Sequence, residues 1–422
     1  MKIKIVLVFL FLVTGVNYLT AQEDKLYSVI SKADSAYDAK NYEESIKLYS
    51  ILIESYPDSV MYYRRRGFSF HNLNRFDEAK KDYLKAIELG ANAYNPYVNL
   101  ANIYILEENY VKAFELTDYA ITDFGENDEL LYHRAVSLFN TEKYEQSKQD
   151  FIKVIKLAPD KKSPYNYLGN IYREEENYDE AIKSYLKAIE LDPAYEIAYF
   201  NLGNVYLDLE KYDSAINNYT KAINLGFVKA EAYEARGMAY LLNLNYPKAI
   251  IDFSYLINTG KANAFRYKNL AEVYYYSNKN SEAVVYYTKA IKLDNKYAEA
   301  YSGRGKAYDD LKENEKSIAD HNTAVNLEPD DIEILSERAL FYVRHNSIPL
   351  GKIDYKKVVE LCSVKLKSKP KSLFLLTSRA TGYFYLDKYD EAMADCNEVL
   401  KIDPSDAIVT PIIREINKFR SK

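Results

Sequence analysis

Two adjoining segments of equal length carry the pattern that organises this chain. Residues 162–195 read KSPYNYLGNIYREEENYDEAIKSYLKAIELDPAY, and residues 196–229 read EIAYFNLGNVYLDLEKYDSAINNYTKAINLGFVK. When one is written above the other, Leu-Gly-Asn, Tyr-Asp, Ala-Ile and Lys-Ala-Ile fall at the same positions. A spacing of 34 residues, from 162 to 196, is typical of stacked supersecondary units rather than of separate globular domains.

The same spacing extends in both directions along the chain. Repeats 1 to 9 start without gaps at residues 26, 60, 94, 128, 162, 196, 230, 264 and 298, and repeats 10 and 11 start at residues 332 and 373. We therefore expect eleven repeats within a repeat array over residues 22–406, and we number the positions of each repeat from its first residue.

Small residues at two positions predict how each repeat folds. Position 20 is Ala, Ser or Gly throughout, and Tyr recurs at positions 4, 11 and 24. Position 8 is occupied by Ala33, Gly67, Ala101, Ala135, Gly169, Gly203, Gly237, Ala271, Gly305, Ala339 and Ala380. Small side chains let two antiparallel helices approach closely, while 44 Tyr and no Trp supply the large rings that fill the seams.

This pattern resembles the tetratricopeptide repeat family over residues 26–406, with Tyr in place of that family's usual Trp at position 4. Proline closes the second helix at position 32 in Pro57, Pro159, Pro193, Pro329 and Pro404. The resemblance implies an all-α fold, an α-solenoid in which antiparallel helix pairs form a right-handed superhelix with a concave inner wall. It also implies a protein or peptide partner, without identifying one.

The C-terminal part of the array departs from the regular spacing. Repeat 10 is 41 residues long, from 332 to 373, so we expect its second helix to run through Leu366, about two turns longer than its siblings. Apolar residues then recur at helical spacing in Ile408, Ile412, Ile416 and Phe419. We expect residues 407–422 to form the capping helix that a terminal repeat needs for solubility.

Position 7 divides the repeats into two classes. Six repeats carry Arg there, and each of these has Asp sixteen residues later, at position 23. The pairs are Arg66 and Asp82, Arg134 and Asp150, Arg236 and Asp252, Arg304 and Asp320, Arg338 and Asp354, and Arg379 and Asp395. The other five combine Lys32 with Leu48, Leu100 with Leu116, Leu168 with Ser184, Leu202 with Asn218, and Leu270 with Tyr286. We interpret the six as structural ion pairs between the two helices of a repeat; an anion site at Arg is the alternative.

The N-terminus has the layout of a secretory signal peptide. Lys2 and Lys4 precede an apolar run over residues 5–13, and Ala21 offers a small residue at a cleavage site. We therefore expect residues 1–21 to be removed from an exported protein that is periplasmic or secreted; an uncleaved signal anchor is the alternative. No later run approaches the length of a transmembrane segment, so none is expected in the mature chain. Loss of Lys2 and Lys4 would lower the net charge from −6 to −8, which argues against nucleic-acid binding.

Catalytic and metal-binding motifs are missing from the sequence. No phosphate-cradling Gly-rich loop, His-Glu-x-x-His helix or Gly-x-Ser-x-Gly elbow occurs, so no enzyme activity, cofactor or metal is expected. The four histidines are scattered as His71, His133, His321 and His345, and His321 at position 24 is interpreted as a core residue. Cys362 and Cys396 could form a disulfide in an oxidising compartment, or could be buried thiols.

In the family, positions 2, 5, 6, 9, 12 and 13 of the first helices face the inner wall. In this chain those positions begin with a basic entrance, Arg64, Arg65 and His71, and they become acidic in repeats 7 to 10. An asparagine amide both donates and accepts, so an Asn-rich stretch can bind a peptide backbone while apolar neighbours hold its side chains. The expected peptide-binding groove is Asn99, Asn102, Tyr132, Asn166, Asn170, Phe200, Asn201, Asn204 and Asn269. A solvated inner face that is rich in Asn through composition alone is the alternative, as is contact through the convex side or the ends.

The sequence thus favours a non-catalytic scaffold that binds an extended segment of a partner protein in its concave groove. An alternative is a targeting or regulatory subunit of an envelope enzyme complex, with the chemistry in another chain.

Overall fold

The computed structural model describes residues 25–420, and every regular element in that range is a helix. The expected signal peptide, residues 1–21, lies outside the described residues. Among the helices of residues 25–420, none is both long enough and apolar enough to cross a membrane.

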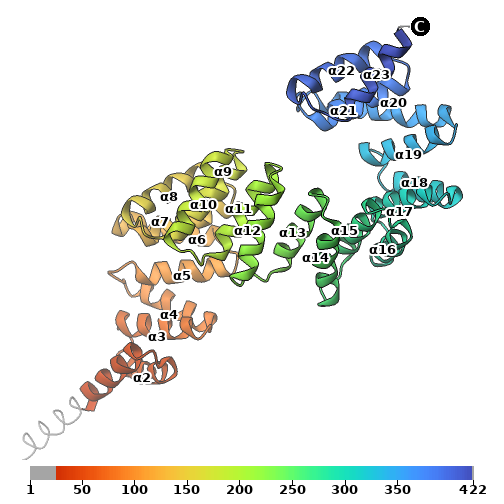
Figure 1. The fold of residues 1–422 in the computed structure, drawn as a ribbon. Coiled ribbons are helices and arrows are strands. Elements are labelled where there is room, and N and C mark those ends of the chain that lie inside the picture. The colour runs from red at the N-terminus through yellow and green to blue at the C-terminus, as the bar shows by residue number, and fades with distance from the viewer. Residues whose placement is uncertain (1–24, 421–422) are drawn as a thin grey trace, which may run out of the picture. The chain divides into compact units, whose positions relative to one another are not determined.

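The helices follow one another as antiparallel pairs (Figure 1). The first helices are the helix over 25–38, α3 (Val60–Asn72), α5 (Asn95–Leu106), α7 (Asp128–Asn140), α9 (Lys162–Glu174), α11 (Glu196–Asp208), α13 (Ala230–Leu242), α15 (Ala264–Tyr276), α17 (Ala298–Asp310), α19 (Ile332–Arg344) and α21 (Leu373–Tyr385). The second helices are α2 (Tyr42–Ser55), α4 (Phe76–Glu88), α6 (Tyr110–Phe124), α8 (Tyr144–Leu157), α10 (Tyr178–Leu191), α12 (Tyr212–Asn224), α14 (Tyr246–Asn258), α16 (Asn280–Leu293), α18 (Asn314–Leu327), α20 (Ile348–Lys365) and α22 (Tyr389–Ile402). A last helix, α23 (Val409–Arg420), follows them.

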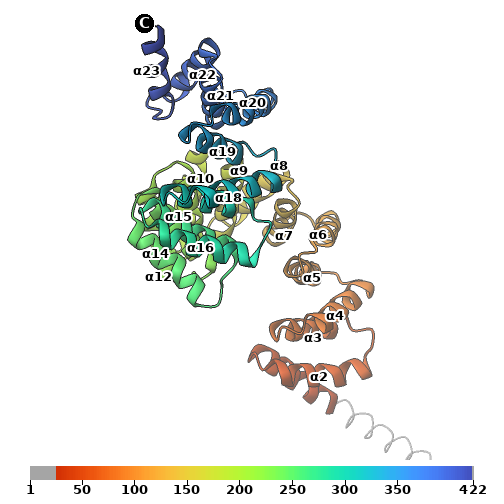
Figure 2. The same ribbon diagram turned by 90° about the vertical axis from the view of Figure 1, so that its right-hand side faces the viewer.

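The chain divides into two compact bodies, Met1–Val205 and Tyr206–Lys422, with the boundary inside α11. We call them the N-terminal and the C-terminal body. Within each body, successive helices pack on their neighbours in chain order, as a second view shows (Figure 2). This layered order is that of an α-solenoid, in which each repeat buries its apolar face on the next.

A residue in the left-handed conformation joins the two helices of each pair. It is Lys40, Asn74, Glu108, Glu142, Glu176, Glu210, Leu244, Asn278, Lys312, Asn346 and Asp387, all with φ between 56° and 62°. The backbone N–H three residues beyond the first helix then bonds back to it, as when Arg75 N–H donates to the Phe70 carbonyl at 2.9 Å. Helices commonly end this way, although Gly usually takes the left-handed position.

In every repeat except 3 and 11, which have Thr117 and Cys396, the two helices of a pair close on an aromatic ring at position 24. Tyr49, Tyr83, Tyr185, Tyr287, Tyr355, Phe151 and Phe253 are all fully buried there. Gly169 shows why position 8 must be small, because a Cβ atom at that residue would lie 2.5 Å from the Tyr185 ring. The small residue at position 8 and the ring at position 24 therefore pack as one unit, which explains why both recur every 34 residues.

The six Arg and Asp pairs join the two helices on one side of this packing unit. Each guanidinium donates through Nε and Nη2 to both carboxylate oxygens, at 2.7 to 2.9 Å. All six Asp are buried, and burial raises the pKa of Asp82 although Arg66 opposes the shift. Such two-pronged geometry is specific to Arg, because Lys offers no planar fork.

Each of these Arg side chains also reaches the preceding repeat, which the sequence analysis did not foresee. The Nη1 atom donates to Ser50, Asp118, Thr220, Thr288, Asn322 and Ser363, sixteen residues earlier in every case, at 2.7 to 3.3 Å. Leu replaces Arg in repeats 3, 5, 6 and 8, where the residue sixteen earlier is Leu84, Ile152, Leu186 and Ser254, apolar in three of the four. The Arg therefore links three helices from two consecutive repeats, and a three-position comparison of the repeats would have found this.

Repeat 10 corrects one expectation. Helix α20 has 18 residues against 14 in α22, so it is about one turn longer rather than two, and it ends at Lys365. The remaining extra residues, 366–371, form turns before α21. The chain leaves the helix before Pro370, since the residue before a proline disfavours the helical conformation.

The capping helix and the cysteines complete the end of the C-terminal body. Helix α23 buries Val409, Ile412 and Ile416, whereas Ile408 precedes the helix and is exposed, contrary to expectation. Phe419 is also exposed, but its ring stacks on Tyr389 with centroids 5.5 Å apart. Both cysteines are free, buried thiols, and burial raises the pKa of each to about 11.

The ion pair between Arg236 and Asp252 offers a test of this packing. Asp252→Leu strands a charge on Arg236 and is expected to cost about 3 kcal/mol, whereas the double variant Arg236→Leu/Asp252→Leu, which copies repeat 3, is expected to recover most of that loss. Urea denaturation followed by circular dichroism measures both. If the double variant is no more stable than Asp252→Leu, an apolar contact between two leucines does not replace the ion pair at this position.

Candidate functional site

The candidate site is a cavity of about 340 Å³ on the first helices of the N-terminal body. It is lined by Tyr37, Arg64, Phe68, Asn95, Val98, Asn99 and Glu129. These residues come from four successive first helices, the helix over 25–38, α3, α5 and α7, and they occupy positions 2, 5, 6, 9 and 12 of their repeats. The expected inner-wall positions therefore meet in one place.

The cavity has an apolar wall and separate charged groups. Tyr37 and Phe68 lie with ring centroids 5.4 Å apart, and Val98 is buried beside them. Burial raises the pKa of the Tyr37 hydroxyl, while Arg65 and Arg64 oppose the shift, so the ring is uncharged at neutral pH. This wall can hold an aliphatic or aromatic side chain.

Arg64 is the cation available to a ligand at this cavity. Among the described residues, no carboxylate lies within 4 Å of its guanidinium, and it donates no hydrogen bond there. Glu129 comes from α7, on the other side of α5, and its carboxylate likewise forms no ion pair within residues 25–420. The cavity thus offers one cation, one anion and the amides of Asn95 and Asn99 to an entering segment.

The other two members of the basic entrance do not present positive charge. Arg65 donates to Asp34 and, at 3.0 Å, to the Tyr49 hydroxyl, which itself donates to Asp34 at 2.6 Å. Burial lowers the pKa of His71, so its ring is neutral at pH 7, and its Nε2 lies 3.4 Å from Asn102 Nδ2. The expected entrance of three residues is therefore reduced to Arg64.

Most of the asparagines expected in the groove serve the array instead. Asn166 is buried and accepts from Asn201 Nδ2 at 3.1 Å, and Asn170 accepts from the Tyr185 hydroxyl at 2.6 Å. Asn269 is fully buried, and neither polar atom of its amide has a partner among the described residues. The contact between Asn166 and Asn201 joins two first helices, and the contact between Asn170 and Tyr185 joins the two helices of repeat 5. Asn99 is the one of the nine that lines the cavity.

The aromatic members of the expected groove lie elsewhere. Tyr132 lines a separate cavity of about 430 Å³ with Asp160, Lys161, Lys162, Ser163, Pro164 and Leu191. Both lysines there are paired, Lys161 with Asp128 at 2.5 Å and Lys162 with Asp192. Phe200 and Asn204 are half-buried.

The inner positions of the C-terminal body are acidic in sequence, and several of these carboxylates have partners within the array. Glu234 pairs with Arg266 at 3.1 Å, Glu272 with Lys268 at 3.1 Å, Glu337 with Lys306 at 3.2 Å, and Asp309 with the ring of His345 at 2.6 Å. Three of these pairs join residues 31 to 36 positions apart, in consecutive repeats. They therefore hold repeats together. Within residues 25–420, no group of three or more His, Cys, Asp or Glu side chains is placed to hold a metal ion.

Family models locate the repeats independently. Models described as "TPR repeat" or "Tetratricopeptide repeat" match residues 30–96, 128–161, 169–209, 197–225, 271–312, 298–331 and 379–406. The chain contains tetratricopeptide repeats. The stretches 97–127, 226–270 and 332–378 lie outside these matches, so the count of eleven tetratricopeptide repeats remains a prediction from the spacing.

Parts of known proteins are similar in sequence to this chain. The chain is 25% identical over 150 residues to RNA polymerase II-associated protein 3 of Rattus norvegicus, which covers 35% of this chain and 22% of that protein. It is 28% identical over 121 residues to the Hsp70-Hsp90 organising protein of Plasmodium falciparum, which covers 27% of this chain and 21% of that protein. The chain thus spans about a fifth of the length of these relatives.

A solved structure reproduces the architecture over nearly the whole chain. Yeast Tom70 superposes with a TM-score of 0.51 at 14% identity, covering 94% of this chain and 96% of that one. This similarity shows the fold, a solenoid of helix pairs.

His321 gives a test of the buried repeat core. Its ring takes the place of the usual tyrosine at position 24 against Gly305, and burial lowers its pKa to about 4, with Asp309 opposing and Lys306 and Arg338 assisting the shift. Below about pH 6.5 the unfolded His321 binds a proton that the folded ring excludes, so stability falls as the pH drops towards 4. Above that range the ring is neutral in both states.

His321→Tyr restores the pairing seen at Gly169 and Tyr185 and removes this proton uptake. Between pH 7.5 and pH 5 the wild type is expected to lose about 2 kcal/mol more than the variant does. Urea titrations of both proteins at the two pH values measure the difference. Equal losses in the two proteins would show that His321 does not carry the pH dependence.

Proposed function

We propose that this chain is a non-catalytic scaffold that binds an extended segment of a partner protein on the first helices of the N-terminal body. The observation that carries the proposal is the cavity around Arg64. It combines a cation free of ion pairs, an apolar wall of Tyr37, Phe68 and Val98, and the amide of Asn99. Such a set suits a peptide whose backbone meets the amides, whose apolar side chain meets the wall, and whose carboxylate meets Arg64.

The comparisons support the broader part of this proposal. The relative from Plasmodium falciparum is named for organising Hsp70 and Hsp90, and its similarity to this chain is confined to 121 residues. A scaffold role is consistent with that name. The position of the bound segment rests on the cavity alone.

Charge reversal at Arg64 tests the cavity. Arg64→Glu is expected to weaken binding by about tenfold or more, because it replaces the attraction for a carboxylate by repulsion, and its folding is unaffected because Arg64 forms no ion pair to lose. The control is Lys81→Glu, the same charge change at an exposed lysine of α4. Full-length wild type and both variants are used as bait in the source organism, and captured proteins are quantified by mass spectrometry.

Partners that are retained by Lys81→Glu and lost by Arg64→Glu support the proposal. If every partner is captured equally by all three baits, the cavity is not the binding site. Asn99→Ala provides a second, uncharged change in the same cavity, with a smaller loss expected.

We further propose that the protein is exported, on the basis of the basic, apolar and small-residue pattern of residues 1–21. N-terminal sequencing of the protein purified from its source is expected to begin at Gln22. A chain that begins at Met1 in the cytosolic fraction would overturn this proposal.

A further inference from the structure

A second cavity, of about 470 Å³, lies where repeats 2 and 3 meet and involves both second helices. Its lining is Leu84 and Ile87 from α4, Tyr97, Leu100 and Tyr104 from α5, and Lys112, Glu115, Leu116 and Tyr119 from α6. Leu84 and Tyr119 are about half exposed, at 49% and 55%. This apolar cavity is distinct from the one around Arg64, with which it shares no residue.

The cavity occupies the place that the Arg network fills in other repeats. In repeat 4 the corresponding positions hold Arg134, Asp150 and Asp118, and the hollow there measures about 270 Å³ with mostly polar walls. In repeat 3, positions 7 and 23 are Leu100 and Leu116, and position 25 of the preceding repeat is Leu84. A leucine shorter than Arg thus replaces the guanidinium, and two leucines that form no hydrogen bond replace its acceptors, so the hollow in repeat 3 is apolar.

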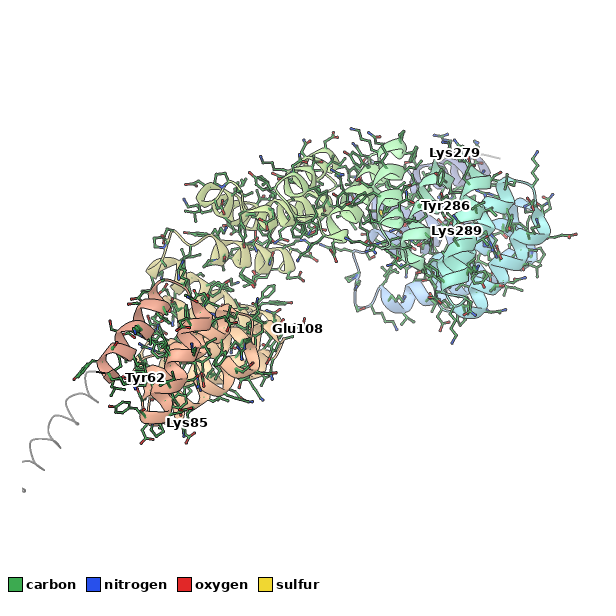
Figure 3. The ribbon with its side chains drawn as sticks, turned by 90° about the horizontal axis from the view of Figure 1, so that it is seen from below. Tyr62, Lys85, Glu108, Lys279, Tyr286 and Lys289 are labelled. Atoms are coloured by element: carbon green, nitrogen blue, oxygen red, sulfur yellow. The ribbon has the colours of Figure 1, made fainter. Side chains whose placement is uncertain are left out.

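Repeat 8 also lacks the Arg, but there the chain fills the space itself. Tyr286 stands at position 23, and its ring stacks on Tyr274 at 5.2 Å with an interplanar angle of 5°, and lies 6.3 Å from Tyr267. Lys289 Nζ lies 4.5 Å from the centre of the Tyr286 ring, and Figure 3 shows these two residues together. Repeat 8 is therefore an internal example of what this kind of junction accommodates.

One of the two rings that hold Tyr286 has a half-buried counterpart in repeat 3, Tyr104; the other counterpart, Tyr97, is buried and stacks on Tyr119 with centroids 6.0 Å apart. Tyr97 and Tyr104 occupy positions 4 and 11, as Tyr267 and Tyr274 do in repeat 8, while position 23 is the shorter Leu116. Lys112 Nζ lies 5.7 Å from the centre of the Tyr104 ring, and it forms no ion pair among the described residues. A cation at the rim of an aromatic slot attracts the negative face of an entering ring.

We infer that this cavity binds an aromatic side chain, Phe or Tyr, of a partner protein, in the position that Tyr286 takes in repeat 8. The ring meets Tyr104 and the exposed Tyr119, displaces water from Leu84 and Leu116, and has Lys112 beside it. Stacked or edge-to-face contacts of this kind are the preferred arrangements of aromatic pairs. The site is a docking surface of its own, and it does not depend on the proposed binding at Arg64.

The probe for this site is N-acetyl-L-phenylalanine amide, which presents the ring with a neutral backbone. Its binding to the full-length protein is titrated by ligand-observed saturation-transfer NMR, with N-acetyl-L-alanine amide as the control ligand. We expect millimolar binding of the first and at least fivefold weaker binding of the second. Arg64→Glu is expected to leave this binding unchanged, which separates the outcome from that of the proposed function.

Two variants exchange the properties of repeats 3 and 8. Leu116→Tyr fills the slot from within, as in repeat 8, and is expected to weaken binding of the phenylalanine probe at least fivefold. Adding Tyr286→Leu to that variant opens the slot of repeat 8, where Tyr267, Tyr274 and Lys289 remain, and is expected to restore binding. Unchanged binding by Leu116→Tyr, or a double variant that binds no better than Leu116→Tyr, overturns the inference. Leu84→Gln at the exposed rim is the substitute if Leu116→Tyr does not fold, with the same loss expected.

Discussion

The structure depends on the contact between a small residue at position 8 and a buried side chain at position 24, which is a ring in every repeat except 3 and 11, where it is Thr117 and Cys396. Gly169 illustrates the constraint, since a Cβ there would lie 2.5 Å from the Tyr185 ring and the ring or the helix would have to shift. Each helix pair packs on the next one, so a change in the spacing of the two helices in one pair would also displace the neighbouring repeats. This contact therefore sets the geometry on which the ion pairs, the seams and both cavities are built.

The second layer of organisation is the junction between consecutive repeats. Six junctions are joined by an Arg that holds Asp in its own repeat and a polar side chain in the preceding one. The junction before repeat 3 is apolar and open, and repeat 8 fills its slot with Tyr286. A solenoid that uses different chemistry at successive junctions can vary its surface without changing its backbone, since all three solutions occupy the same space.

The inner face shows which features of a binding site a repeat pattern can predict. The positions that line the Arg64 cavity were expected, and Arg64 and Asn99 were among the expected residues. Asn166, Asn170, Asn201 and Arg65 carry suitable groups at suitable positions, yet each is engaged within the array. The sequence shows an amide or a guanidinium in the same way whether its partner is a ligand or a neighbouring helix. Only the three-dimensional structure shows which of the two partners it has.

The sequence by itself determined the helix pairs, the period and the pairing of Arg with Asp, because these follow from local periodicity and from contacts at a constant separation of sixteen residues. Only the tertiary structure decided the third partner of each Arg, the one-turn lengthening of α20, and which inner side chains stay available. Those features depend on how a side chain of one repeat meets the next. A side chain's partner across a repeat junction is set by packing in space, which the identity of a single residue does not specify.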